Sequence, residues 1–190
     1  QVYRLDQHHP ALRNAVEWLF DSQTSDGDIR GILGTQYMPY YHGMILALVI
    51  EAGYSKDPRV EAGLEWLLRM RQDDGGWIVP AQAVPPARKT LAFWHQAPVL
   101  PDRARPNSHM ATGMSIRALA VHPRYCRRTE VRRAAVCLKE RFFRPEPYND
   151  RKAPTYWTKL GFPYWWTDLL MALDSVSRIG YGVEDPHVTS

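Results

Sequence analysis

The sequence predicts an all-α fold, a curved two-layer array of about three helical hairpins in a single domain of residues 1–190. Stretches with one apolar stripe at helical spacing alternate with stretches that are apolar on every side. Parts of the chain also repeat one another, and long proline-rich connections alternate with short ones. Each hairpin joins an outer helix, with one face exposed to solvent, to a buried inner helix. Such hairpins stack into two layers.

The first hairpin begins with a one-sided helix that follows Pro10. Its apolar residues have the i, i+3, i+4, i+7, i+8 spacing of a single helix face: Leu12, Ala15, Val16, Leu19 and Phe20. A loop rich in Ser, Asp and Gly covers residues 22–34 and leads to a second helix at residues 40–52. Residues 44–50 of that helix are apolar on every side, so we expect it to be buried all round and to end at Gly53.

The second hairpin has the same two parts. Its one-sided helix follows Pro58 and carries the stripe Val60, Leu64, Leu67 and Leu68. A long connection over residues 79–107 precedes a mostly apolar helix at residues 108–121, in which Arg117 is the single charge. We therefore expect this second inner helix to be buried too.

The third hairpin repeats the order. Thr129 is expected to cap a one-sided helix over residues 130–143. Another long connection, with four prolines, leads to an apolar helix from about Tyr164 to Ile179, which Gly180 ends.

Three sets of short motifs show that the hairpins are repeats. In the outer helices, Ala15-Val16-Glu17-Trp18-Leu19 recurs as Gly63-Leu64-Glu65-Trp66-Leu67. The inner helices share Leu46-Ala47-Leu48, Arg117-Ala118-Leu119 and Met171-Ala172-Leu173, and their exits share Asp57-Pro58, His122-Pro123 and Asp185-Pro186. Self-similarity of this kind is the signature of a stacked array.

Composition excludes several other classes. Hydrophobic residues make up 45% and charged residues 23% of the chain, which excludes disorder of the whole chain. The longest apolar stretch, residues 44–50, is far shorter than the roughly 18–20 residues that span a bilayer. Cys126 and Cys137 would lie roughly 16 Å apart on one helix, beyond disulfide reach, so we expect a reducing, cytoplasmic setting.

The net charge of +4 is unevenly distributed. Residues 124–152 carry ten basic and four acidic side chains, a density that suits a phosphate or nucleic-acid surface. A solvated helix with basic flanks is the preferred interpretation, because stacking aromatics are absent until Phe142 and Phe143. Nucleic acid is therefore not an expected partner.

The repeats resemble the α/α toroids of squalene and hopene cyclases and of protein prenyltransferase β-subunits. The resemblance rests on the repeat motif of that family, an aromatic-Leu pair, then Gln, then Gly-x-Trp. One copy is complete, with Trp66, Leu67, Gln72, Gly75 and Trp77. A degenerate copy, which we call the worn copy, keeps Trp18-Leu19, Gln23 and Gly27 but has Ile29 in place of Trp. The resemblance implies a structural role for Gln72 and Trp77.

A complete toroid in that family has about twice as many helices. The resemblance therefore implies a partial ring, which is either a fragment of a longer chain or half of a ring closed by a second copy. We expect an open apolar flank to be covered by self-association or by further sequence, since large exposed apolar patches are uncommon on monomers.

The long outer-to-inner connections are expected to gather at one end of the array, with the first turns of the inner helices. That end is the predicted binding site, because loops on a rigid scaffold carry function. Aromatic residues there would suit a hydrophobic or ring-shaped ligand: Tyr40, Tyr41, Trp94, Trp157, Trp165 and Trp166. Each of these aromatic residues could equally have a structural role and hold its own loop against the core.

Polar residues at the inner-helix starts are the predicted catalytic or metal-binding group. His42, His109 and Asp168 have the composition of a catalytic zinc site with one open position. Prenyltransferases bind zinc with Asp, Cys and His, and the resemblance places their His at His42. No cysteine occupies the matching place, so His109 would have to replace it. Satisfied buried histidines and a helix cap are the ordinary alternative.

The acidic Asp-x-Asp-Asp motif of the cyclases is absent, and no other motif supplies a strong acid. The predicted function is therefore a terpenoid-cyclase-like or prenyltransferase-like domain around an apolar cavity for an isoprenoid-like or other hydrophobic ligand, with catalysis unassigned. Two alternatives remain open. One is a carbohydrate-processing α/α barrel, which needs a second carboxylate opposite Asp168. The other is a non-catalytic interaction module.

Overall fold

The computed structural model describes residues 5–31, 33–149, 152–159 and 166–189. Its helices are α1 (Pro10–Phe20), α2 (Pro39–Val49), α3 (Pro58–Arg69), α4 (His109–Val121), α5 (Thr129–Lys139), α6 (Leu169–Ile179) and the short α7 (Pro186–Thr189). Within these ranges β-structure is limited to two isolated bridges. The all-α prediction is confirmed, and none of the described helices is long and apolar enough to cross a membrane.

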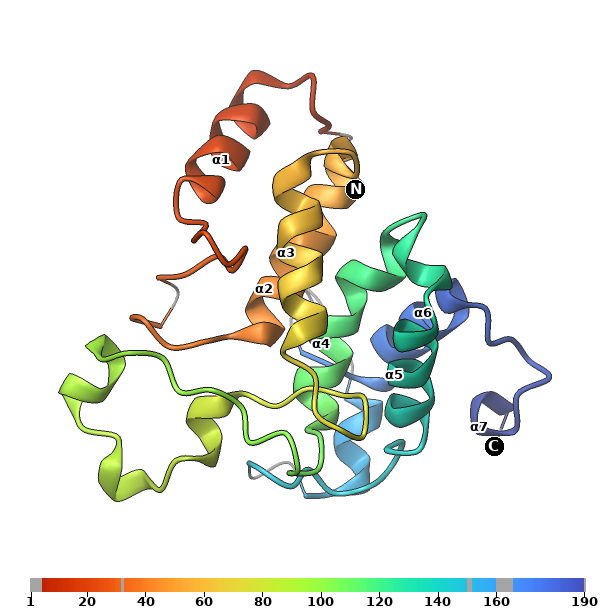
Figure 1. Cartoon of the computed structure of the whole chain (residues 1–190). Helices are drawn as coiled ribbons and strands as arrows, with labels where there is room; N and C mark the ends of the chain where they lie inside the picture. The colour runs from red at the N-terminus through yellow and green to blue at the C-terminus, as the bar shows by residue number, and fades with distance from the viewer. Residues whose placement is uncertain (1–4, 32, 150–151, 160–165, 190) are drawn as a thin grey trace.

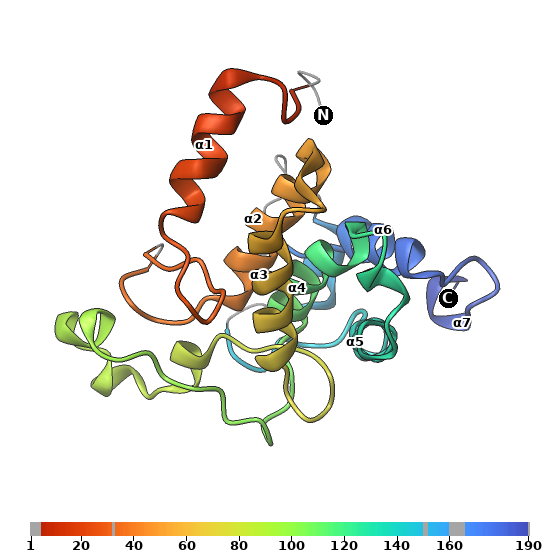
Figure 2. The same cartoon turned by 45° about the horizontal axis from the view of Figure 1, so that its top comes forward.

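The helices form two layers (Figures 1 and 2). In the inner layer, α4 packs against α2 on one side and α6 on the other. In the outer layer, α3 packs on α2 and touches α4, while α5 packs on both α4 and α6. Helix α1 stands away from the other helices, at the upper left of Figure 1. The connection before α4 projects to the lower left and contains short 3-10 turns.

Burial follows the predicted alternation in α2 and α4 and departs from it in α6. Helices α2 and α4 are buried over most of their surface, and α3 and α5 on one side. Helix α6 was expected to be buried all round, but its Leu170 is 47% exposed and its buried residues lie on one face. The reason is its position, because α6 is the last in the row of described inner helices.

Two predicted helix boundaries are corrected. Helix α6 begins at Leu169, because Asp168 accepts a hydrogen bond from the Met171 N–H at 2.8 Å and caps the helix there. The predicted start, Tyr164, lies outside the described residues. Helix α5 begins at Thr129, which is its first residue and not its cap, and it ends at Lys139. The chain turns soon afterwards, and Phe143 adopts a left-handed φ of 59°.

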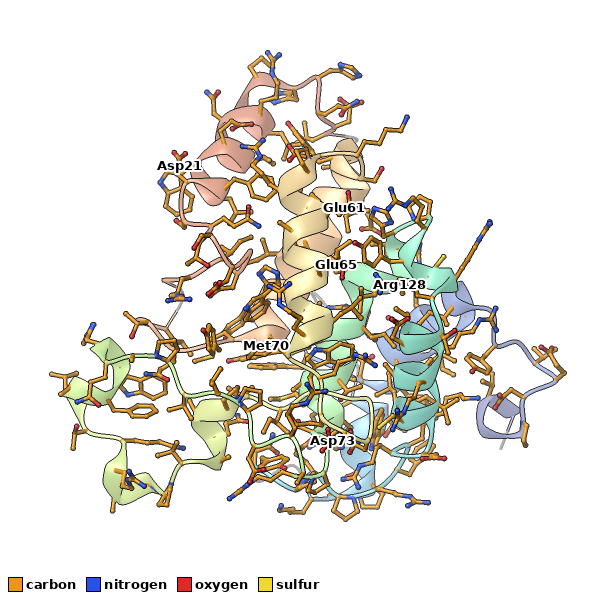
Figure 3. All side chains as sticks on the ribbon, in the orientation of Figure 1. Asp21, Glu61, Glu65, Met70, Asp73 and Arg128 are labelled. Carbon is orange, nitrogen blue, oxygen red and sulfur yellow. The ribbon has the colours of Figure 1, made fainter. Side chains whose placement is uncertain are left out.

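The outer helices are tied by an ion pair that recurs between repeats. Glu17 of α1 pairs with Arg59 at 2.6 Å, and Glu65 of α3 pairs with Arg128 at 2.5 Å. Both glutamates are the eighth residue of their helix, and both arginines lie at the start of the next outer helix. Figure 3 shows Glu65 and Arg128 side by side. Exposed pairs contribute little stability, so their value here is to show that the repeats share one geometry.

The Gln and Trp residues of the repeat motif connect separate elements. The indole N–H of Trp77, which is fully buried, donates to the Leu67 carbonyl oxygen near the end of α3 at 2.8 Å. The Trp77 backbone N–H donates to the Thr112 hydroxyl on α4 at 2.9 Å. Gln72 donates to the Asp102 carbonyl oxygen at 2.6 Å. In the worn copy, Gln23 donates to the carbonyl oxygen of Arg59 on α3 at 2.9 Å.

Helices α2 and α4 approach each other closely at Gly43. A Cβ atom at this position would lie 2.6 Å from the Ser115 Cα and 2.8 Å from the Met114 carbonyl oxygen. Both neighbours are backbone atoms of α4, which no rotamer change can move aside. The absence of a side chain at Gly43 therefore sets the separation of these two inner helices.

We expect Gly43→Ala to destabilise the protein by about 1–3 kcal/mol through overpacking. Helix propensity alone predicts the opposite sign, since Ala is about 1 kcal/mol more favourable than Gly inside a helix. Urea unfolding of both forms measures the difference. An unchanged or raised unfolding free energy would show that α2 and α4 are not held this close.

Candidate functional site

The first predicted site residue, His42, is built into the core. It lies in the first turns of α2 and is 1% exposed. Its Nδ1 accepts a hydrogen bond from the Ile29 backbone N–H at 3.1 Å, and its Nε2 donates to the Gly63 carbonyl oxygen at 3.0 Å. These contacts assign the neutral Nε2–H tautomer. Burial lowers the pKa of His42 to about 4, so the ring is neutral at neutral pH.

The second residue, His109, belongs to a buried carboxylate–imidazole pair. It is the first residue of α4, and its Nδ1 lies 3.2 Å from Glu146 Oε2, with both side chains fully buried. Trp157 packs on the imidazole with 4.6 Å between ring centroids. Backbone N–H groups of Met110 and Tyr148 also donate to Glu146, at 3.2 and 3.3 Å. Burial raises the pKa of Glu146.

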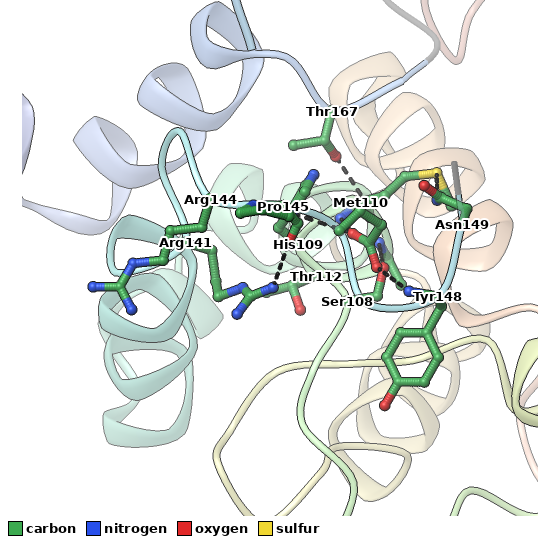
Figure 4. A network of polar contacts seen from close by, with 12 residues as sticks. Ser108, His109, Met110, Thr112, Arg141, Arg144, Pro145, Tyr148, Asn149 and Thr167 are labelled. Atoms are coloured by element: carbon green, nitrogen blue, oxygen red, sulfur yellow. Dashed lines mark hydrogen bonds and ion pairs between the residues drawn. The ribbon is translucent and has the colours of Figure 1, made fainter. Parts of the chain in front are cut away.

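Figure 4 shows the network around the start of α4. Thr167 donates from its hydroxyl to the Met110 carbonyl oxygen at 3.0 Å. This contact is possible because Gly113 lacks a side chain, whose Cβ would lie 2.2 Å from the Thr167 methyl carbon. The next residue, Asp168, caps α6. The starts of α4 and α6 thus lie at one end of the array, as predicted.

The structure does not bring His42, His109 and Asp168 together. Each has a separate set of partners: α3 for His42, Glu146 for His109, and the first turn of α6 for Asp168. Among the residues that the structure describes, no three His, Cys, Asp or Glu side chains are placed to share a metal ion. The zinc site therefore stays a prediction that the geometry of the described residues does not support.

The aromatic residues predicted to bind the ligand lie in three different settings. Tyr40 is buried against Tyr41, with 4.1 Å between their ring centroids, and Trp157 is buried on His109. Trp94 packs edge-on against Phe93, and its carbonyl oxygen accepts from the Thr35 N–H, which ties the first two long connections together. Trp166 is 38% exposed, and Trp165 lies outside the described residues.

A second polar group, which the sequence analysis did not predict, lies across the three inner helices. Glu51 follows α2, Arg178 is in the last turn of α6, and their side chains pair at 3.9 Å although α4 lies between the two helices. Arg178 also pairs with Asp174 at 2.9 Å. Arg117 of α4 lies in the electrostatic field of Asp168, Asp174 and Glu51, and burial lowers its pKa.

This contact defines one surface of the inner layer. Glu51 and Arg178 pair across α4, so this surface spans the three inner helices. We call it the inner face, with the residues Leu48, Glu51, Arg117, Leu170, Asp174 and Arg178. Leu48 precedes Glu51 by three residues and Leu170 precedes Asp174 by four, so each leucine shares a helix face with its carboxylate. The two leucines are 64% and 47% exposed.

Sequence reasoning missed Glu146 and the inner-face charges for different reasons. Glu146 lies in a Pro-Glu-Pro segment of a long connection, and a carboxylate fixed between two prolines was the only available signal. Arg117 was visible as a lone charge in an apolar helix. Glu51 is far in sequence from Asp174 and Arg178, and only the packing of α2 and α6 on α4 brings it near them.

Fold and site together describe an all-α protein whose helices pack in two layers. No family model matches the chain. Over 74 residues the chain is 35% identical to the terpene cyclase-glycosyl transferase fusion protein fsoA of Humicola fuscoatra. The match covers 38% of this chain and 5% of that protein, so the chain spans a small part of its relative's length. The chain is thus related in part of its sequence to a terpene cyclase fusion protein.

Proposed function

We propose that this chain is a terpenoid-cyclase-like α/α-toroid domain, three hairpins of a ring whose inner face binds an isoprenoid-like or other hydrophobic ligand. The order of outer and inner helices, the contacts of Gln72 and Trp77, and the partial similarity to a terpene cyclase fusion protein support the proposal. Ligand binding is assigned to this chain, whereas the activity of a complete ring would need residues from further repeats or a second copy.

The observation that carries the proposal is the amphipathic character of the inner face. Leu48 and Leu170 expose apolar surface on α2 and α6, and charged groups lie one helix turn further along. Apolar sites that use a few fixed polar groups to orient the ligand are typical of small-molecule binding. The surface therefore suits a ligand with an apolar body and one polar end.

Helix α7 supports a continuation of the ring by further repeats. Asp185-Pro186 starts α7 as Asp57-Pro58 starts α3, and Val follows two residues after Pro in both. Lys139 of α5 pairs with Asp185 and lies 3.7 Å from the ring centroid of Tyr181. Asp185, just before α7, is thus tied to the last turn of α5.

Binding of a fluorescent farnesyl alcohol tests the proposal. We expect Leu48→Asp and Leu170→Asp each to weaken binding about tenfold or more, because a charge replaces apolar surface that the ligand would cover. Leu91→Asp is the matched control, since Leu91 is 84% exposed on a long connection and should leave binding unchanged. Equal losses in all three variants, or saturable binding that none of them alters, would contradict the inner-face site.

A carbohydrate-processing barrel is a second candidate, because Glu51 and Asp174 provide two carboxylates on the inner face in addition to Asp168. The geometry favours it less. Arg178 pairs with both Glu51 and Asp174, and Asp168 caps α6, so each carboxylate is engaged within the fold. The farnesyl probe distinguishes the two, since a sugar site would not depend on the apolar surface of Leu48.

A further inference from the structure

Two cavities lie at equivalent places in successive repeats. The first seam, about 290 Å³, is lined by Asp26, Tyr37, Trp66, Arg69, Met70 and Arg103, among others. The second seam, about 370 Å³, is lined by Asp74, Asn107, Arg133, Cys137, Arg141 and Arg144, among others. Each lies between the turn that ends one outer helix and the last turn of the next outer helix.

The residues match position by position. Asp26 and Asp74 each precede a glycine with positive φ, and Tyr37 and Asn107 each lie two residues before an inner helix. Trp66 is the ninth residue of α3, as Cys137 is of α5. Met70 and Arg141 each lie four residues further on. The second seam is therefore a modified copy of the first.

The modifications change both the size and the chemistry of the cavity. In the first seam, Tyr37 packs against Trp66 with 5.7 Å between ring centroids and fills much of the space. Cys137 and Asn107 take these two places in the second seam, whose volume is larger, about 370 Å³ against about 290 Å³. Arg141 replaces Met70, and Arg133 and Arg144 add two more guanidinium groups. The second seam therefore has three arginines, where the first has two, Arg69 and Arg103.

The acidic residues of the second seam are Asp74 and Glu140. The carboxylate of Asp74 accepts from the Gly76 N–H at 3.0 Å and from the Asn107 N–H and side-chain amide at 2.7 and 3.0 Å. Glu140 is exposed to solvent. Arg141 donates from one terminal nitrogen to the Pro145 carbonyl oxygen at 2.8 Å. Its buried Nε meets no acceptor among the described residues, which is the state that an oxyanion would satisfy.

The surroundings of Cys137 suit a site that binds a ligand without forming a covalent bond to it. Its Sγ accepts a hydrogen bond from the Asn107 side-chain amide at 2.8 Å. Burial raises the pKa of Cys137 to about 12, so the thiol stays protonated at neutral pH and is a weak nucleophile. The chemistry left to the cavity is charge-assisted hydrogen bonding by arginine.

We propose that the second seam binds the phosphoryl group of a small phosphorylated ligand through Arg133, Arg141 and Arg144. Guanidinium groups form paired, charge-assisted hydrogen bonds to phosphate oxygens, and three around a cavity of about 370 Å³ suit a phosphate or diphosphate. The site lies on the outer helix α5 and is separate from the inner face, so it does not rest on the proposed function.

Calorimetric titration with inorganic pyrophosphate at constant ionic strength tests the site. We expect saturable binding by the unmodified protein and about tenfold or greater weakening in Arg141→Ala and Arg144→Ala. Arg103→Ala is the matched control, because it removes one positive charge from the first seam, and it should bind normally. Cys137→Met should weaken binding without any change of charge, since the longer side chain fills the cavity.

The controls make the outcome decisive. Thermal melting of each variant confirms that it folds, and Arg144 is exposed, so its substitution leaves the core intact. A lipid headgroup could supply the same phosphoryl group, so vesicles of phosphatidylcholine with and without phosphatidic acid form a second arm. If vesicles bind in an Arg141-dependent way and pyrophosphate does not bind, the proposal of a small soluble ligand is overturned. Absence of saturable binding, or equal weakening in Arg103→Ala, would overturn the site.

Discussion

Trp77→Ala is expected to lower the free energy of unfolding by about 3–5 kcal/mol, the range for removing a large buried aromatic side chain. Trp77 is fully buried and its indole N–H satisfies the Leu67 carbonyl oxygen near the end of α3. The substitution would leave a cavity between α3 and α4 and one carbonyl without its partner. Urea unfolding followed by circular dichroism measures the loss.

An exposed tryptophan provides the control for this prediction. Trp18 occupies in α1 the place that Trp66 occupies in α3, yet it is 73% exposed. Trp18→Ala should therefore change the unfolding free energy by no more than about 0.5 kcal/mol. Trp77→Phe keeps most of the side-chain volume, so its unfolding free energy should fall between those of Trp77→Ala and Trp18→Ala. A Trp77→Ala protein as stable as Trp18→Ala would refute the assignment of Trp77 to the scaffold.

Acidification is expected to destabilise the protein through His42. Its folded-state pKa of about 4 lies below the ordinary value of 6.5, because the ring is buried and hydrogen-bonded in its neutral form. The unfolded state therefore binds more protons below pH 6.5. The contribution of His42 is fully present above that pH and is lost as the pH falls toward 4, to a total of about 3 kcal/mol.

Comparison with His42→Gln isolates this contribution, since glutamine does not titrate and can still donate to the Gly63 carbonyl oxygen. Asp28 is the acidic group that acts on His42, and it is present in both forms. Between pH 7 and pH 4 the unmodified protein should lose about 3 kcal/mol more unfolding free energy than the variant. Parallel pH dependences would show that His42 is not held neutral by the core.

Most of the fold could be predicted from the sequence because its signals are local. The apolar stripe of α3, the all-round apolar segment in α2 and the glycine at Gly180 depend on neighbours within a few turns. The start of α6 could not be predicted, since the aromatic run Tyr164-Trp165-Trp166 lies just before Thr167 and Asp168 and extends the apolar pattern of the helix. The cap at Asp168 decided the boundary.

The candidate site depended on packing, and there the sequence was a poorer guide. Residue type alone grouped His42, His109 and Asp168, but each residue found its hydrogen-bond partners in a different neighbour. Glu146 entered the picture only because a long connection returns to the start of α4. A polar side chain in the core is satisfied by whichever group the fold brings within reach, and sequence spacing does not encode that group.

The sequence by itself determined the helical class, the alternation of outer and inner helices and the register of the repeat, because hydrophobic periodicity and helix-ending residues act over a few residues. Tertiary structure alone decided which charged residues share the inner face and which arginines surround the second seam. Glu51 and Arg178 meet across α4, and Asp74 and Arg144 line one cavity, because helices pack over long sequence separations. Side-chain contacts of that range are set by the curvature and spacing of whole helices.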